Sequence, residues 1–178
     1  MSKRQPLTWP AQANDVWSMD LVFDRIAGGR VLKCLTVVDD ATHEAIAVIP
    51  EHAISGLHRT LFDQIGLVRG LPRVTRSDNG KEFTGTAMLT WAYEQGIDLR
   101  LIEPDKPNQN AYIESFNGRL RDECLNEHWF TSLAYARSVI EIWRHEYEER
   151  PKKGLGGLTL AAYAKQLASN KYIVTSGL

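Results

Sequence analysis

The hydrophobic pattern changes its period near residue 50, and this change constrains the fold more than any other feature. Before it, apolar residues alternate or run together in three closely spaced segments, Val16–Phe23, Val31–Val38 and Ala45–Ile49. Three strands with such short connections predict an antiparallel meander. After it, apolar residues from Ile54 to Val68 recur at the three- and four-residue spacing of an amphipathic helix. The chain is therefore expected to fold as an α/β protein.

The remainder of the chain alternates short strands with helices. Strands are predicted over Arg73–Ser77 and Ile97–Leu101, with a helix over Thr86–Gln95 between them. This order favours parallel pairing with crossover helices. Further helices are expected after Asn110, a favourable N-cap residue, after Ser132, and over the segment Leu158–Leu167.

Composition excludes several classes of protein. No apolar run in the 178 residues approaches the ~18 that a membrane span needs, and the N-terminus lacks the apolar core of a secretory signal. Cys34 and Cys124 predict neither a disulfide framework nor a zinc site, and they fit a reducing cytosol. The net charge of −1 argues against a stand-alone DNA-binding module. A net charge of −1 is still compatible with an enzyme that gains positive charge from bound metal ions, or with a fragment whose DNA-binding domain lies elsewhere.

Three acidic residues stand where a carboxylate needs an explanation. Asp20 interrupts an apolar strand, Asp78 ends a strand at the turn Asp78–Gly80, and Glu114 lies in the first turn of a helix. Each has an ordinary structural interpretation: an edge-strand residue facing water, a common turn, and favourable charge placement at a helix N-terminus. Burial of an unpaired carboxylate is costly, so Asp20 is the least ordinary of the three.

The acids carry more information together than separately. Asn117, Gly118 and Arg121 follow Glu114 on one helix face, apart from the apolar stripe that includes Phe116. The strands of the first two acids are expected to be neighbours, with this helix covering their edge. Three convergent carboxylates raise one another's pKa unless a cation lies between them. Carboxylate oxygens suit Mg²⁺ or Mn²⁺, and two such ions can promote phosphoryl transfer.

These residues and their spacing resemble the catalytic cores of retroviral integrases and the related bacterial insertion-sequence transposases, known as the DDE superfamily. As in that superfamily, 35 residues separate the second acid, Asp78, from Glu114, and a basic residue, Arg121, follows seven positions later. The resemblance extends over about Asn14 to Tyr163. The other matching stretches are Trp17–Asp20, Thr36–Asp40, Ser77–Gly80 with Glu82-Phe83, Lys106–Asn110, Glu114–Gly118 and Arg121–Asn126.

The resemblance implies a ribonuclease H-like fold, with a five-stranded mixed sheet of order 3-2-1-4-5 and helices on both faces. Residues 1–15 are then a linker, 16–150 the catalytic core and 151–178 a C-terminal extension with a short helix. It also implies that Asp20, Asp78 and Glu114 bind two Mg²⁺ or Mn²⁺ ions, with Asp20 bridging them. Water would then cut DNA at the end of the element, and the freed 3′-hydroxyl would attack a second phosphodiester. Further DNA contacts, or support of the site, are expected from Arg121, Asn79, Lys106, Asn110 and Asn117.

The implied partners are DNA, at the element ends and at the target, and further copies of the chain in a homodimer or higher oligomer. Related transposases carry a helix-turn-helix region before the core, which residues 1–15 are too short to form, so a shortened chain is expected. One stretch departs from the family pattern. The usual Arg-Pro-His-Ser-Ser-Leu-Gly reads Arg150-Pro151-Lys152-Lys153-Gly154-Leu155-Gly156 here, where a DNA contact of the family could differ.

Two other functions fit parts of the pattern. A nuclease of the same fold would need a fourth carboxylate and would leave Arg121 without a role. An inactive remnant that only folds and dimerises would not need the intact set of acids.

Asp39 and Asp40 are interpreted as turn residues. None of the histidines has metal-ligand spacing with a cysteine, which predicts that the zinc-binding module of retroviral integrases is absent: His43, His52, His58, His128 and His145.

Overall fold

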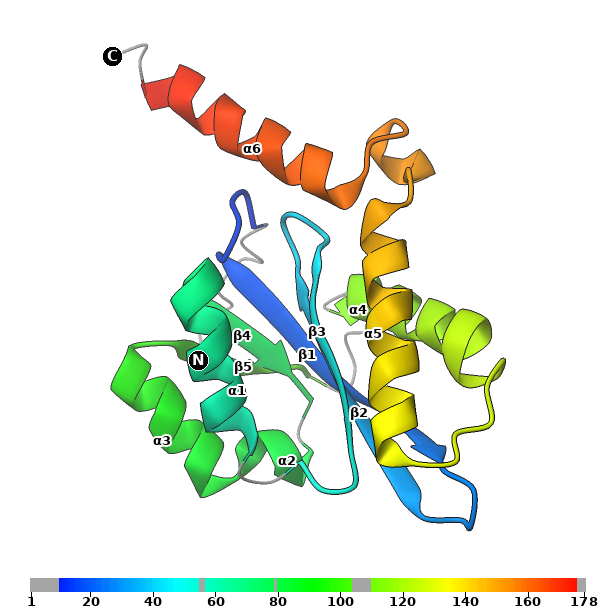
Figure 1. Ribbon diagram of the computed structural model, residues 1–178. Helices are drawn as coiled ribbons and strands as arrows, with labels where there is room; N and C mark the ends of the chain where they lie inside the picture. Colours follow the sequence, from blue (N-terminus) through cyan, green and yellow to red (C-terminus); the bar gives the residue numbers. More distant parts are fainter. Residues whose placement is uncertain (1–9, 55–56, 79, 104–109, 176–178) are drawn as a thin grey trace.

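One five-stranded sheet forms the centre of the protein (Figure 1). The computed structural model describes residues 10–54, 57–78, 80–103 and 110–175, without the side chains of residues 57, 58 and 170–175. The strand order is β3-β2-β1-β4-β5. The strands are β1 (Val16–Arg25), β2 (Val31–Asp39), β3 (Ala45–Glu51), β4 (Val74–Ser77) and β5 (Asp98–Leu101). The first three strands pair antiparallel and the last two run parallel to β1, which confirms the predicted meander, crossovers and sheet order.

Helices cover both faces of this sheet (Figure 1). One face carries α1 (Leu57–Arg69), α2 (Lys81–Thr84) and α3 (Thr86–Gln95). The other carries α4 (Ala111–Leu120), its continuation η2 (Arg121–Leu125) and α5 (Leu133–Glu149). After η3 (Lys153–Leu155), α6 (Leu160–Thr175) extends away from the sheet (Figure 1). Within the described part of the chain, no helix combines the length and apolarity needed to cross a bilayer.

Each face of the sheet has its own apolar core, because the side chains of β1 and β2 alternate between two covered faces. Trp17 and Met19 pack with Phe62 and Trp91 under α1 and α3. Val22 packs on the other face, with the apolar sides of α4 and α5. Since Asp20 shares its face with Val22, the sheet directs this acid toward α4. This alternation is the local reason that a carboxylate can interrupt an apolar strand and still point toward a second element.

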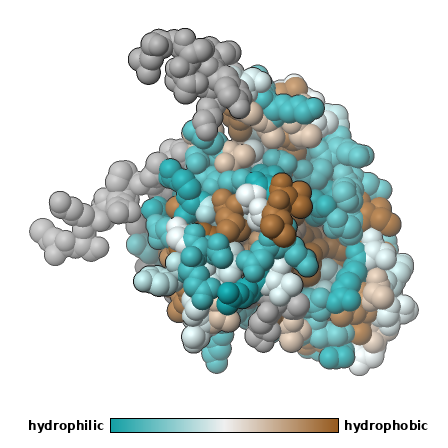
Figure 2. Space-filling view, turned by 60° about the vertical axis from the view of Figure 1, so that its left-hand side comes forward, coloured by the Kyte–Doolittle hydropathy of each residue, from teal (hydrophilic) through white to brown (hydrophobic). Residues whose placement is uncertain are grey.

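The outer surface of α1 and α3 is mixed in character. The face brought forward in Figure 2 shows separate hydrophobic patches among hydrophilic residues. Leu67, Val68 and Tyr93 are exposed large side chains on these two helices. Their helices are nevertheless fixed by the core beneath, which contains Phe62 and Trp91.

The helix predictions are confirmed in outline and corrected in detail. Residues Thr86–Gln95 form the predicted helix, and Ser132 caps α5 by accepting a hydrogen bond of 3.1 Å from the Tyr135 amide. The last helix is longer than the predicted Leu158–Leu167. It begins after Thr159, whose hydroxyl accepts a hydrogen bond from the Ala162 amide, and it continues through residues that lack a clear apolar period. The short helix α2 was not predicted, because its four residues follow directly on a turn signal.

The end of α4 differs from a regular α-helix. Over Arg121–Leu125 the chain forms a π-helix, in which each amide bonds to the fifth residue before it rather than the fourth. The wider turn allows the consecutive residues Cys124 and Leu125 both to be buried against the core. The sequence pattern indicated one continuous α-helical stripe as far as Cys124, because spacing alone does not distinguish the two helix types here.

Candidate active site

The pairing of β1 with β4 brings the first two acids together. These strands are parallel, with Val16 opposite Val74 and Ser18 opposite Arg76. Two further steps along the same register set Asp20 beside Asp78, which directly follows the last residue of β4. Asp20 is half-buried and Asp78 is exposed. The predicted neighbourhood of these two acids therefore follows from the strand register.

Helix α4 supplies a direct partner for Asp20. The Asn117 side-chain amide donates a hydrogen bond of 2.9 Å to Asp20 Oδ2. The other oxygen, Oδ1, accepts a hydrogen bond of 2.8 Å from the Leu21 amide. Asn117 lies on the helix face that the sequence assigned to Glu114 and Arg121, so this contact turns the Glu114 face toward β1. Both oxygens of Asp20 are thus held in place.

The three acids interact electrostatically. Burial raises the pKa of Asp20 above its ordinary value, and the negative charges of Asp78 and Glu114 raise it further. The hydrogen bonds from Leu21 and Asn117 act in the opposite direction. The described groups that act on this carboxylate include no lysine or arginine. Carboxylates that repel one another suit a hard divalent cation.

The acids do not form a closed cage. Over the described residues, no group of three or more His, Cys, Asp and Glu side chains is close enough to hold a metal ion as it stands. Asp78 accepts a hydrogen bond of 2.8 Å from the Gly80 amide, and both Asp78 and Glu114 are exposed. Exposed side chains change rotamer within nanoseconds. The residues fit a divalent ion in charge and ligand chemistry, with one fixed carboxylate and two that can turn.

Arg121 lies in the same region as Asp20. Together with Asn117 and Gly118 they line a hollow of about 280 Å³ between β1 and α4. The Arg121 guanidinium donates a hydrogen bond of 2.8 Å to the Phe23 carbonyl, which holds it over this hollow. Outside the backbone of its own helix and its two chain neighbours, no heavy atom lies within 4 Å of the position that a Cβ at Gly118 would occupy, so the hollow is open beside the helix. The Asn117 amide and the Arg121 guanidinium therefore face a common space, as the helix spacing predicted, but the acid that lines it with them is Asp20 of β1 and not Glu114.

The remaining predicted contact residues differ in what the structure shows of them. Asn117 and Asn110 are buried, and each has a side-chain carbonyl oxygen with no hydrogen-bond partner in the described structure. Asn110 occupies the N-cap position of α4, but the predicted capping hydrogen bond is not formed, because its side chain is turned into the protein. Asn79 and Lys106 lie outside the described residues. DNA binding by these four residues stays a prediction.

The sequence did not reveal the full role of Asp39. This residue ends β2 before the predicted turn, and its side chain is completely buried. It accepts hydrogen bonds from the amides of Asn14, Ala41 and Thr42 at 2.7, 3.0 and 3.1 Å, and from the Arg69 guanidinium at 2.8 Å. Asp39 therefore holds the β2–β3 turn, the start of β1 and the end of α1 together. It has a structural role, as the turn interpretation implied.

Asp40 gives a testable pH dependence. Burial raises its pKa from 3.8 to about 6, although the Ser18 hydroxyl donates to it at 2.8 Å and Arg76 lies 3.6 Å away. Because the folded state holds this proton more strongly than the unfolded state, its contribution to stability is greatest below pH 4. The contribution falls as the pH rises to about 6, by up to about 3 kcal/mol.

The test compares urea unfolding of the wild type with that of Asp40→Asn at pH 4 and pH 7. Other titrating groups cancel in this difference, so the variant should gain stability relative to the wild type at the higher pH. A difference that is the same at both pH values would contradict the expectation.

Comparisons with known proteins identify the family of the chain and its fold. Two family models described as "Integrase core domain" match residues 10–107 and 95–159. An uncharacterized 31.7 kDa protein of insertion element IS407 from Burkholderia multivorans is 51% identical over 166 residues, which are 92% of this chain and 60% of the relative. An uncharacterized 39.2 kDa protein of insertion element IS476 from Xanthomonas euvesicatoria is 50% identical over 184 residues, covering 100% of this chain and 53% of the relative. The chain thus spans little more than half the length of these relatives.

Solved structures are similar in fold. The integrase catalytic core of HTLV-2, determined in complex with magnesium in a trimeric form, matches with a TM-score of 0.62 and 15% identity over 84% of this chain and 95% of that one. A chain of the simian T-cell lymphotropic virus intasome, in complex with a PP2A regulatory subunit, matches with a TM-score of 0.65 and 14% identity. The match covers 80% of this chain and 51% of that chain. These similarities confirm the ribonuclease H-like fold. The family models, which match most of the chain, show that it belongs to the integrase core domain family.

Proposed function

We propose that this chain is the catalytic core of a DNA transposase. In the proposed reaction a phosphodiester is cut at the end of a mobile element, and the freed 3′-hydroxyl is joined to a second DNA strand. The observation that carries the proposal is geometric: the pairing of β1 with β4 brings Asp20 and Asp78 together, and Asn117 and Arg121 face Asp20 across one hollow. Self-repelling carboxylates next to an arginine are typical of a site for metal ions and phosphate.

Asp20, Asp78 and Glu114 are the residues that would hold two Mg²⁺ or Mn²⁺ ions. When bound, such ions supply activation of the attacking oxygen and stabilisation of the leaving oxygen. The magnesium in the HTLV-2 integrase core supports this choice of metal. Two divalent ions would also change the formal charge from −1 to +3, which favours the approach of DNA phosphates.

The protein's own groups would divide the remaining work. The amide of Asn117 and the backbone of Leu21 fix the orientation of Asp20, so one carboxylate is placed before any ligand arrives. Asp78 and Glu114 would turn toward Asp20 from the surface. Arg121 would bind a phosphate of the DNA strand that lies in the hollow, since guanidinium groups pair well with phosphate oxygens.

The partners follow from the same family. We propose that the active assembly contains DNA and at least two copies of the chain, in line with the intasome and the trimeric form described for the structural neighbours. Because the chain spans 60% and 53% of its two insertion-element relatives, the proposal covers the catalytic core and leaves recognition of the element ends to other parts of such proteins.

The test is a strand-joining assay on branched DNA oligonucleotides, which allows joining or its reversal without element-specific recognition. The wild type should act with Mg²⁺ or Mn²⁺ and be inactive with EDTA. Asp78→Asn should abolish the activity, whereas Asp98→Asn, an equal charge change on the neighbouring strand β5, should retain it.

Two outcomes would contradict the proposal. Preferential cutting of RNA–DNA hybrids without joining would identify a nuclease of the same fold. A folded, dimeric protein that is inactive with either metal would identify a remnant.

A further inference from the structure

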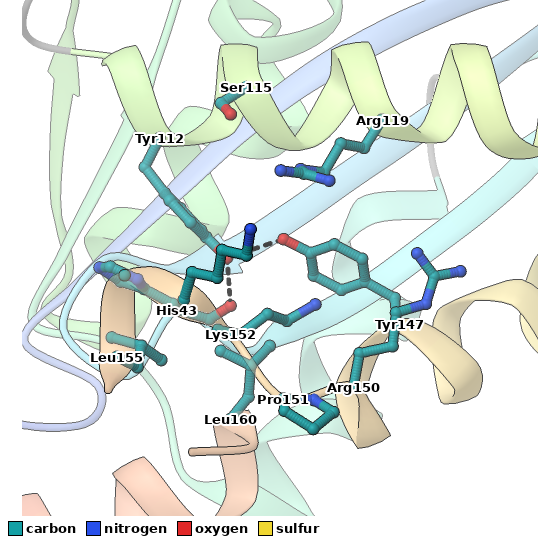
Figure 3. Close-up of a pocket in the computed structure, with 12 residues that line it drawn as sticks. His43, Tyr112, Ser115, Arg119, Tyr147, Arg150, Pro151, Lys152, Leu155 and Leu160 are labelled. Carbon is teal, nitrogen blue, oxygen red and sulfur yellow. Dashed lines mark hydrogen bonds between the residues drawn. The ribbon is translucent and has the colours of Figure 1, made fainter. Parts of the chain in front are cut away.

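A second pocket lies on the other side of α4 from the acids. It has a volume of about 500 Å³ and is built from α4, the β2–β3 turn, the end of α5 and the segment that leads into α6 (Figure 3). Tyr112, Ser115 and Arg119 face it from α4, at the spacing of one helix face. Glu114 and Arg121 lie on a different face of the same helix. The pocket is therefore separate from the candidate active site, and about one helix diameter, ~10–12 Å, divides them.

The lining of this pocket is strongly basic. It includes four cationic side chains and no carboxylate: Arg119, Arg150, Lys152 and Lys153. Glu123, outside the lining, pairs with Arg150 at 2.6 Å and with Arg119 at 3.8 Å. Within the described structure, neither lysine forms an ion pair. Glu148 is the other acid that acts on Lys152, so cations outnumber the neighbouring acids by four to two.

Lys152 is the best-positioned of these cations. Its ammonium lies 3.3 Å from the centroid of the Tyr147 ring, a cation–π contact that holds the side chain in the pocket. Its backbone is fixed by hydrogen bonds of 2.9 Å with Leu158 and Gly157. Burial and the charges of Arg150 and Arg119 together lower the pKa of Lys152 to about 8, against the opposing effect of Glu148 and Glu123. A bound anion would relieve this repulsion between cations.

The donors of the pocket suit phosphate. Arg119, Arg150 and Lys152 line one pocket, and the Tyr147 hydroxyl points toward the Tyr112 hydroxyl 3.5 Å away (Figure 3). Planar guanidinium and ammonium groups together satisfy several oxygens of a tetrahedral anion. Lys152 and Lys153 are also two of the positions at which this chain departs from the usual family sequence, so the basic character belongs to this chain's own residues.

We propose that the pocket binds a backbone phosphate of DNA that also passes over the acids. Double-stranded DNA carries one charge per ~1.7 Å of axis, so a strand at the active site presents other phosphates one helix diameter away. The identity of the ligand as DNA rests on the proposed function. The phosphate chemistry rests on the pocket alone.

The test measures binding of a fluorescein-labelled DNA duplex by anisotropy, in EDTA and at 50 to 200 mM salt. Lys152→Met, which keeps the side-chain stem on Tyr147, should weaken binding about tenfold and reduce the slope of log K against log salt by about 0.9. Lys152→Arg should retain both values. Lys165→Met, on the exposed side of α6, is the matched control and should bind like the wild type.

A second experiment distinguishes a DNA backbone phosphate from a free phosphate compound as the ligand of the pocket. Inorganic phosphate is titrated at constant ionic strength, with Tyr147 and its neighbours followed by NMR. If Lys152→Met binds DNA as tightly as the wild type, the proposal is overturned. If inorganic phosphate binding then still depends on Lys152, the pocket is assigned to a free phosphate compound instead. Because DNA binding is measured without metal, loss of strand joining in Asp78→Asn leaves this result unaffected. The two proposals can therefore fail separately.

Discussion

Asp20→Asn is expected to abolish strand joining and, at the same time, to make the metal-free protein more stable. The carboxylate is half-buried, and its pKa is raised by burial and by the charges of Asp78 and Glu114, so its ionised form opposes folding. Asparagine has the same shape. Its amide can still meet Asn117, because the side-chain carbonyl of Asn117 has no partner and can accept a hydrogen bond after a flip. The substitution therefore removes the repulsion without leaving a gap.

The loss of activity should be at least about 10³-fold, more than the roughly 10- to 100-fold that follows removal of a group that only supports a metal ligand. In EDTA, the urea midpoint of the variant should exceed that of the wild type, and the advantage should grow as the pH rises and Asp20 ionises. Mg²⁺ should stabilise the wild type but not the variant. Asp98→Asn, at an exposed position, should change neither property. A variant that is less stable than the wild type in EDTA would refute the idea that these acids repel one another.

The second large effect is expected at Asp39, where substitution should damage the fold rather than the chemistry. Asp39→Ala leaves Arg69 half-buried without its closest partner and removes the acceptor of three backbone amides. Breaking a buried ion pair from one side typically costs about 3–5 kcal/mol. We expect a loss of this size in the free energy of unfolding.

Chemical denaturation of four proteins measures this effect. They are the wild type, Asp39→Ala, Arg69→Met and the double variant. Because the double variant no longer carries a guanidinium that has lost its closest partner, it should lose less than the sum of the two single losses. Glu44 also contacts Arg69, at 3.2 Å, so the recovery should be partial. Strictly additive losses would show that Asp39 and Arg69 act independently.

The sequence predicted most of the sheet because strand and helix periods are local properties. The two-residue alternation in β1 and the glycine after α3 each specify a structure without reference to distant residues. Gly96 adopts the left-handed conformation, with φ of 70°, and its amide bonds back to the last turn of α3. The same logic placed Ser132 at the start of α5.

Other features depend on contacts that no local pattern contains. The bond between Asn117 and Asp20 joins residues 97 positions apart, so spacing could place Asn117 on the right helix face but could not name its partner. The basic pocket combines α4 with a segment beyond α5, and the sequence analysis treated Arg150–Gly156 only as a departure from a family pattern. The π-helix at Arg121 follows from packing of Cys124 and Leu125 against the core, which becomes visible only once the helix is docked.

The unequal anchoring of the three acids has a consequence for how well the host's own DNA is protected from cleavage. A nuclease centre that were fully formed in the free protein could damage any chromosome it met. Here the Asp20 carboxylate is held by two hydrogen bonds, whereas Asp78 and Glu114 are exposed and Asp78 is held only by the Gly80 amide of its own turn. Under the proposed function, the reactive arrangement would arise only when metal and DNA draw these side chains inward, so the idle enzyme would be harmless to its host.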